Sequence, residues 1–223
     1  MEELERLAGI IRDEGLRGKV LELLRDPCID LEGEMLPFDE CPGGAYVHHA
    51  YKGGLIQHTV AVTRLCVTLC DMVEDLYRGE VNRDHVMAGA LLHDVMKCYV
   101  YTRNGYGGFR TSHLGERVDH LSLLVAEMYK RGFPTDVIHV VAAHHGEKSP
   151  VRPKSLEALI VSVADFADSE LSRQTLRAAE WLIRETTGVR RQCGSSEEAL
   201  EIIRVKAEEG WEGVNRLNSG KDK

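Results

Sequence analysis

The sequence lacks the features that mark several classes of protein. It has no CxxC pair, and its six cysteines do not have the spacing of a small disulfide-stabilised scaffold, so reduced thiols are expected. No uninterrupted apolar run approaches the roughly 20 residues that a membrane-spanning helix needs. The first 15 residues, MEELERLAGIIRDEG, are acidic and amphipathic, which does not match a secretory signal. These absences predict a cytoplasmic protein with no membrane partner.

An excess of basic residues is also missing. The chain carries 28 Lys and Arg against 36 Asp and Glu, a net charge of −8. Long nucleic acids are held largely by basic side chains on their phosphates, so no such partner is expected, although a small basic pocket remains compatible with this charge. No linker, repeat or low-complexity tract interrupts the 223 residues, which predicts one compact domain. Whether the chain forms a homo-oligomer stays open.

Hydrophobic periodicity predicts an all-α fold. Two short helices are expected before residue 27, followed by helices over about 55–77, 82–97, 115–130, 134–145, 155–185 and 195–209. Ser195 and Glu198 form the capping box of the last helix, and a weakly ordered tail is expected after it. Residues 28–54 are expected to be mostly loop, and residues 99–111 a small hairpin or loop. Within one domain we expect N-terminal helices (1–44), a core (45–190), and a C-terminal helix and tail (191–223).

Two polar residues, His93 and Asp94, interrupt the apolar segment GALLHDVMKC at residues 89–98. Burying a carboxylate without a partner is costly, so Asp94 requires a compensating group. More histidines and one further acid lie among apolar neighbours in other expected helices, namely His58, His120, His144, His145 and Asp165. A single residue of this kind is usually satisfied by a hydrogen bond within the core. Several of them in different helices are explained together by a metal that binds N and O ligands.

The order of these motifs resembles that of the HD-domain metal-dependent phosphohydrolases. GGLIQHT, ALLHDVMK, DHLSL and AAHHGEKSPVRPKSLEALIVSVADFAD contain the family pattern H…HD…D, and the resemblance covers roughly residues 45–190. It implies an enzyme with a single HD-domain helical bundle. The positions that match the family's metal ligands are His58, His93, Asp94, His120, His144, His145 and Asp165. In family members with two metals, the Asp of the HD pair bridges them, so the implied cofactors are two divalent transition-metal ions, with Fe(II) preferred over Mn(II).

The resemblance also implies a reaction. The motif blocks are similar to the HD portion of bacterial 3′–5′ exoribonucleases. The upstream HHAYKGG and the short chain are closer to an archaeal branch that hydrolyses dihydroneopterin 2′,3′-cyclic phosphate in pterin biosynthesis. The implied activity is therefore that of a phosphodiesterase acting on a small cyclic phosphodiester, with a 2′- or 3′-monophosphate as product. Two alternatives stay open: a nucleotidase or short-oligonucleotide phosphodiesterase on the same centre, and a catalytically silent HD module that binds a ligand.

Residues outside the ligand set supply further candidates. Lys97 matches the Lys of the family's HDxGK variant, although Met96 stands in this chain where that variant has Gly. Lys97 is expected to bind a phosphate oxygen; the alternative is a solvated lysine near a helix end. His48 and His49 are expected to act in catalysis, in substrate binding or in metal binding, unless they are exposed loop residues. Asp168 lies one turn after Asp165, where it either orients a ligand or is a surface acid.

Weaker candidates for substrate contacts lie in the expected hairpin and just after it. His113 and Arg117 are expected to bind substrate, and Arg103 and Arg110 have a weaker claim as phosphate binders. The aromatic residues that are candidates either for stacking on a substrate ring or for core packing are Tyr46, Tyr51, Tyr99, Tyr101, Tyr106 and Phe109.

Overall fold

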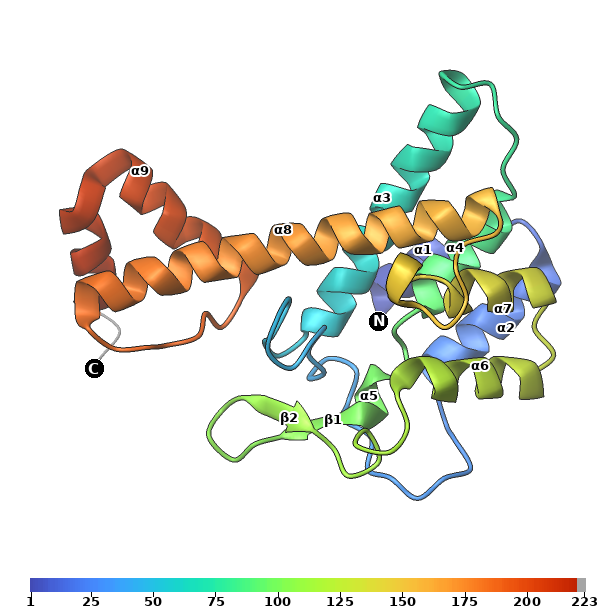
Figure 1. Cartoon of the computed structure of the whole chain (residues 1–223), viewed down its shortest axis with the longest axis horizontal. Helices are drawn as coiled ribbons and strands as arrows, with labels where there is room; N and C mark the ends of the chain where they lie inside the picture. The colour runs from blue at the N-terminus through green and yellow to red at the C-terminus, as the bar shows by residue number, and fades with distance from the viewer. Residues whose placement is uncertain (220–223) are drawn as a thin grey trace.

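Helices build most of the structure, a computed structural model that describes residues 1–219 (Figure 1). They are α1 (Glu2–Ala8), α2 (Glu14–Arg25), α3 (Gly54–Asp75), α4 (Arg83–Leu92), α5 (Lys97–Val100), α6 (His120–Lys130), α7 (Thr135–Ala142), the 3-10 turn η1 (Gly146–Lys148), α8 (Leu156–Thr187) and α9 (Ser196–Ser219). Strands β1 (Tyr101–Arg103) and β2 (Phe109–Thr111) pair antiparallel, with Thr102 opposite Arg110. The all-α class and the small hairpin are confirmed.

The long helix α8 crosses the whole structure (Figure 1). Helices α3, α4 and α7 pack against the first part of α8, and α9 folds back along its last part. The buried apolar residues form three clusters: one among α1, α2, α4 and α6, one among α3, α4, α7 and α8, and one between α8 and α9. The division of the chain at residues 44 and 190 stays a prediction.

Three helices begin or end at residues other than those predicted from the sequence. The helix expected over 82–97 stops at Leu92, and a turn separates it from α5. The helix expected from 115 begins at His120, because the side chain of Asp119 accepts a hydrogen bond from the backbone N–H of Ser122 (2.8 Å) and caps it. Helix α7 ends at Ala142, before the His pair. The expectation that the candidate ligands lie inside helices is therefore wrong for His93, Asp94, His144 and His145.

The C-terminal helix is longer than expected. Its start is capped as predicted, since Ser195 Oγ accepts from the N–H of Glu198 (3.1 Å) and Glu198 Oε2 accepts from the N–H of Gly194 (2.7 Å). The chain then bends at Gly210, where φ is 68°, and continues as helix to residue 219. The buried side chain of Val214 holds this last part against α8. The weakly ordered tail predicted after residue 209 is therefore wrong for 210–219, and 220–223 lie outside the described residues.

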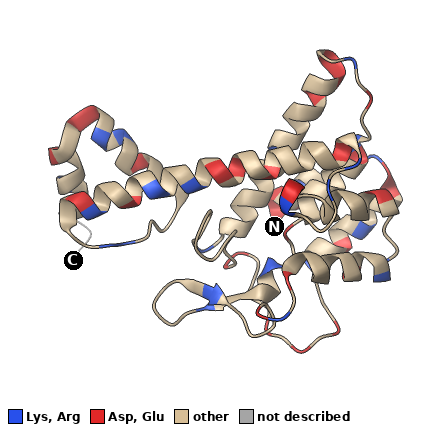
Figure 2. Cartoon of the chain, in the orientation of Figure 1, with Lys and Arg blue, Asp and Glu red and all other residues tan. Residues whose placement is uncertain are grey.

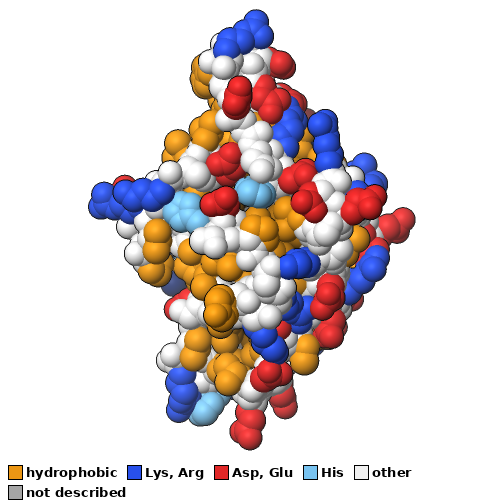
Figure 3. Space-filling view, turned by 90° about the vertical axis from the view of Figure 1, so that its right-hand side faces the viewer, with side chains coloured by type: hydrophobic (Ala, Val, Ile, Leu, Met, Phe, Trp, Pro, Cys, Tyr) orange, Lys and Arg blue, Asp and Glu red, His pale blue; other side chains and the backbone are white. Residues whose placement is uncertain are grey.

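Charged side chains of both signs are interspersed over the surface. Along α8 the first half carries acidic residues and basic residues follow in the second half, while the helices around it carry both signs (Figure 2). On the face drawn in Figure 3, the two signs are mixed and apolar side chains gather near the middle. Among helices within residues 1–219, none is both long and apolar enough to cross a membrane.

A close approach of α4 to α7 gives a first testable prediction. A Cβ added to Gly89 would lie 2.2 Å from Val140 Cγ1, whereas a Cβ on Gly18, exposed on α2, would meet no atom within 4 Å. Gly89→Ala is expected to lower the free energy of unfolding by about 1–3 kcal/mol, because the two helices must separate. Gly18→Ala is expected to raise it by about 0.5–1 kcal/mol through helix propensity. Urea denaturation of both variants tests this, and equal changes would contradict the packing described here.

Candidate metal centre

Five helices bring the predicted ligands to one point between α3, α4, α6, α7 and α8. Only two of these residues lie well inside helices, His58 in α3 and Asp165 in α8. The pairs His93–Asp94 and His144–His145 follow the ends of α4 and α7. Neighbouring residues within a helix point in different directions, so the turns after α4 and α7 let both members of each pair face the same site.

A first group of ligand atoms surrounds the buried ring of His58. His58 Nε2 lies 3.1 Å from His93 Nε2, 3.3 Å from Asp94 Oδ2 and 3.2 Å from Asp165 Oδ1. His93 Nε2 lies 3.3 Å from the same Asp94 oxygen. Ligands that each lie about 2.0–2.2 Å from one ion are roughly 3–3.5 Å apart. The spacing of these four atoms therefore fits one divalent ion.

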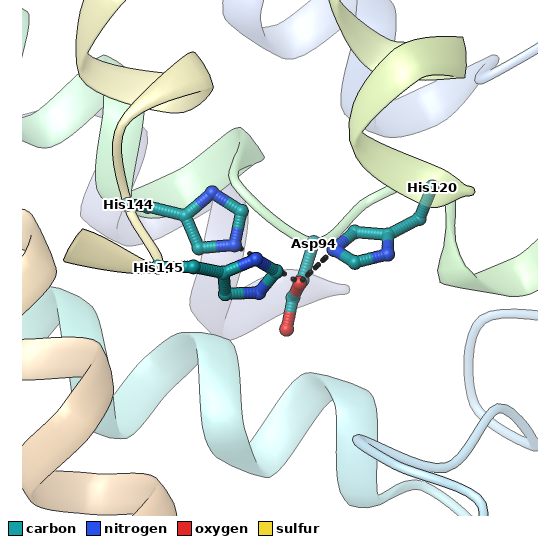
Figure 4. Close-up of side chains that lie close together, drawn as sticks. All are labelled: Asp94, His120, His144 and His145. Atoms are coloured by element: carbon teal, nitrogen blue, oxygen red, sulfur yellow. Dashed lines mark ion pairs between the residues drawn. The ribbon is translucent and has the colours of Figure 1, made fainter. Parts of the chain in front are cut away.

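A second group lies around the other oxygen of the Asp94 carboxylate, Oδ1 (Figure 4). Asp94 Oδ1 is 3.3 Å from His120 Nε2 and 3.7 Å from His144 Nε2. The His144 and His145 rings lie 3.9 Å apart, and one ligand atom of each of these four residues falls within 4.8 Å of all the others. Each oxygen of Asp94 thus faces its own group, which is the arrangement of a carboxylate that bridges two ions.

Hydrogen bonds behind the ligands direct their free nitrogens toward the centre. His93 Nδ1 donates to the carbonyl oxygen of Ala90 (2.8 Å), and His144 Nδ1 donates to that of Val141 (2.7 Å). A carbonyl oxygen only accepts, so the proton must lie on Nδ1 and Nε2 is free to bind metal. His58 Nδ1 lies 2.7 Å from Asp168 Oδ2, the carboxylate–histidine pairing typical of metal sites.

The electrostatics of the site favour a bound cation. Burial raises the pKa of Asp94, but the neighbouring Lys97 and His93 outweigh this effect and hold that pKa well below its usual range. Burial lowers the pKa of His144 well below its usual range, so this imidazole is neutral, as a ligand must be. Burial alone would lower the pKa of His58, yet the neighbouring carboxylates of Asp165, Asp168 and Asp94 raise it to about 10. These carboxylates stabilise positive charge at the centre.

Several buried polar atoms at the centre are left without hydrogen bonds. Among the described residues, the Nε2 atoms of His120 and His144 and Oδ1 of the 99% buried Asp94 have no hydrogen-bond partner, and Asp94 Oδ2 has only the ion pair with Lys97 at 2.5 Å. Buried polar groups are nearly always paired, so these atoms require a ligand. A nitrogen-rich set with two carboxylates suits divalent transition metals better than Mg²⁺, which prefers oxygen. The residues fit the metal centre that the sequence predicted.

The HD domain family matches residues 55–169, more than half of the chain, and this segment contains every ligand described above. The chain belongs to the HD-domain family. HD domains bind divalent metal ions, and this chain carries His and Asp groups arranged to hold them. The chain is thus an HD-domain phosphohydrolase, as its motifs predicted.

Three relatives among known proteins extend this assignment. The dihydroneopterin 2′,3′-cyclic phosphate phosphodiesterase of Methanocaldococcus jannaschii is 42% identical over 213 residues, which are 94% of this chain and 85% of that protein. The 3′-5′ exoribonuclease YhaM of Listeria monocytogenes is 33% identical over 144 residues, 60% of this chain and 44% of the exoribonuclease. The same enzyme of Oceanobacillus iheyensis is 28% identical over 163 residues and is covered over 49% of its length. No solved structure matches the chain.

Lys97 lies within this HD-domain centre and is not a solvated lysine. Its ammonium nitrogen lies 2.5 Å from Asp94 Oδ2 and donates to the carbonyl oxygen of Gly43 at 2.5 Å. The side chain is buried, and the negative charge of Asp94 raises the pKa of Lys97 against the effect of burial. Lys97 therefore supplies part of the compensation that Asp94 requires.

The loop HHAYKGG folds against the HD-domain core. His49 is 3% exposed, and the rings of His48 and His49 lie 5.0 and 5.2 Å from that of His58. His49 adopts a left-handed φ of 45°, held because its N–H donates to Ser172 Oγ (2.9 Å) and its carbonyl accepts from the N–H of Gly43 (2.9 Å). The alternative of two exposed loop histidines is wrong, and Ser172 was not found from the sequence.

The predicted substrate contacts His113 and Arg117 lie apart from the centre. Both are exposed, and Arg117 donates to the backbone carbonyl of His113 (2.8 Å). Neither residue lines the cavity beside the metal ligands. Their role as substrate contacts stays a prediction. Tyr51, a candidate for stacking, is instead buried and shares a hydrogen bond with Ser196 (2.5 Å).

The contact of Asp168 with His58 gives a second testable prediction. Asp168→Asn is expected to weaken metal binding by about 10- to 100-fold, because a neutral amide no longer holds the ring as a charged partner. Titration of metal-stripped protein with Mn(II) measures the change. The matched control is Asp136→Asn, an exposed carboxylate on α7. Asp168 is buried, so the alternative of a surface acid is wrong; if both variants bound metal as the unmodified chain does, Asp168 would not support His58 as a ligand.

Proposed function

We propose that the chain hydrolyses dihydroneopterin 2′,3′-cyclic phosphate to the 2′- or 3′-monophosphate, using two divalent transition-metal ions, with Fe(II) preferred over Mn(II). The observation that carries the proposal is the similarity to the M. jannaschii enzyme, which extends over 94% of this chain. The similarity to exoribonucleases covers less than half of those proteins and supports the shared HD centre alone. The proposed setting is the cytoplasm, with the substrate as partner and neither membrane nor long nucleic acid. Self-association stays open.

Residues around Asp94 would hold the two ions. The first ion would take His58, His93 and Asp165, the second would take His120, His144 and His145, and Asp94 would contribute one oxygen to each. Bound divalent ions supply Lewis-acid polarisation of the phosphodiester and activation of water. The donor set, rich in imidazole, supports Fe(II) or Mn(II) in place of Mg²⁺.

The chain's own polar groups would act on the substrate. Lys97 and His48 line the cavity next to the ligands, so both are accessible to a bound phosphodiester. The Lys97 ammonium would hold a non-bridging phosphate oxygen. Burial and the charge of Lys97 lower the pKa of His48 to about 2, so this imidazole is neutral. We assign it an N–H hydrogen bond to the leaving sugar oxygen.

His49 would act differently from His48. Burial is the main cause that lowers its pKa to about 4, and it does not line the cavity. Its Nε2 lies 3.6 Å from Asp168 Oδ2, the carboxylate that pairs with His58. We therefore assign His49 a positioning role, in which it holds the Asp168–His58 pair.

Anaerobic reconstitution tests the proposal. Metal-stripped protein is loaded with Fe(II), Mn(II), Mg(II) or Zn(II) and assayed on dihydroneopterin 2′,3′-cyclic phosphate, 2′,3′-cyclic nucleotides, a nucleoside monophosphate and a short RNA. We expect the cyclic pterin to be turned over well above the others, with Fe(II) most active. Faster cleavage of cyclic nucleotides or RNA would replace the proposed substrate while keeping the centre. Binding of metal without turnover of any substrate would support a silent module.

A further inference from the structure

A cavity of about 850 Å³ opens directly from the metal centre. At its inner end lie Lys97, His48, His144, His145 and Asp165. A phosphate held at the centre therefore has the rest of its molecule in this cavity. The volume is within the range of about 300–1,000 Å³ that small-molecule sites show.

One wall of the cavity is an apolar stripe on α8. Leu159, Val163 and Phe166 are spaced by four and three residues, so they share one face of the helix. These residues are 50%, 46% and 71% exposed, whereas apolar residues on the opposite face of the same part of α8, such as Ile160 and Ala164, are buried. Phe166 directly follows the ligand Asp165. Spacing alone does not show which apolar face of this helix is covered.

The outer end of the same wall is polar. Glu170 lies one turn beyond Phe166 and forms an ion pair with Arg173 at 2.5 Å, and both residues line the cavity. The hydroxyl of Ser169 lines it as well. A flat apolar surface with donors and acceptors at its edge is the usual form of a site for a heteroaromatic ring.

We propose that Phe166, with Val163 and Leu159, is the platform on which the flat heteroaromatic ring of the substrate lies while its phosphate occupies the metal centre. The inference rests on the proposed function and deepens it, because it names the residues that recognise the part of the substrate that does not react. The continuity of the stripe with the ligand Asp165 favours a small ring joined to the reacting phosphate over a second protein chain. A ring-bearing substrate gains binding energy here that a bare cyclic phosphate does not.

The test compares ligands that share a phosphate and differ in the ring. Phe166→Ala is expected to raise KM for dihydroneopterin 2′,3′-cyclic phosphate, and Kd for the monophosphate product measured by calorimetry, by about 10- to 100-fold. The kcat/KM for glycerol 1,2-cyclic phosphate, which has no ring, is expected to stay within about twofold of the unmodified chain. Phe166→Tyr is expected to restore binding of the ring. Leu171→Ala, an exposed apolar residue of α8 outside the cavity wall, is the matched control and is expected to change nothing.

Metal content is measured for every variant, because it distinguishes an effect on the ring platform from an effect on the metal centre. Equal losses for the ring-bearing and the ring-free substrate, or a loss of metal in Phe166→Ala, would overturn the platform. Ring-bearing product that binds the metal-loaded, unmodified chain no more tightly than glycerol phosphate would overturn it too. Failure of the proposed function would give a different result. The unmodified chain would prefer 2′,3′-cyclic GMP to the cyclic pterin, and Phe166→Ala would still raise the KM for cyclic GMP more than the KM for glycerol 1,2-cyclic phosphate.

Discussion

Asp94→Asn is expected to lower kcat/KM for the cyclic phosphate by about 1,000-fold or more, because both proposed metal positions would use an oxygen of this one carboxylate. Its Oδ2 faces His58 and His93, and its Oδ1 faces His120 and His144. An amide keeps the shape of the side chain but loses the charge, and its nitrogen does not bind metal as a carboxylate oxygen does. We expect the metal content to fall from two ions per chain to one or none.

Metal analysis and steady-state kinetics on the same preparation measure this effect. Asp136→Asn again serves as the exposed control and is expected to retain both metal and activity. If Asp94→Asn kept two ions and near-normal kcat/KM, the carboxylate would not bridge them. Retention of the fold is checked by far-UV circular dichroism, because the same substitution leaves Lys97 without its counter-charge.

Lys97→Met is expected to lower the free energy of unfolding of the metal-free protein by about 3–5 kcal/mol, the usual cost of breaking a buried ion pair. The substitution leaves the Asp94 carboxylate buried without its nearest cation and the carbonyl of Gly43 without its donor. Bound metal provides positive charge at Asp94. The loss of stability is therefore expected to be clearly smaller in the metal-loaded protein, while kcat/KM falls because Lys97 lines the cavity.

Denaturant unfolding with and without Mn(II) measures both states. Lys52→Met is the matched control: this exposed lysine pairs with Glu40 at 3.2 Å, and its loss is expected to cost less than about 1 kcal/mol. Equal destabilisation of the Lys97 variant in the two states would show that metal does not compensate Asp94. No destabilisation in either state would contradict the buried pair itself.

The clustering of these His and Asp side chains was predictable because their chemistry conflicts with their apolar surroundings. A histidine or carboxylate among apolar neighbours, such as His58 or Asp165, is visible in the sequence wherever burial follows from periodicity. The order of the motifs then indicated that these residues share one metal centre. Capping signals such as Ser195 with Glu198 also placed the start of α9, because that interaction is local in sequence.

Features that depend on distant contacts were not predictable. The burial of His49 depends on Ser172, more than 100 residues away, and the pairing of Lys97 depends in part on Gly43. The exposed stripe at Phe166 has the same helical spacing as the buried face of α8, and only the tertiary arrangement distinguishes the two faces.

The most direct test of the account is anomalous X-ray diffraction from crystals of the protein loaded anaerobically with Fe(II) or Mn(II). Two peaks are expected at the metal absorption edge, one beside each oxygen of the Asp94 carboxylate. His58, His93 and Asp165 should surround the first peak, and His120, His144 and His145 the second. A single peak away from Asp94, or no peak within reach of these residues in metal-loaded, active protein, would contradict it.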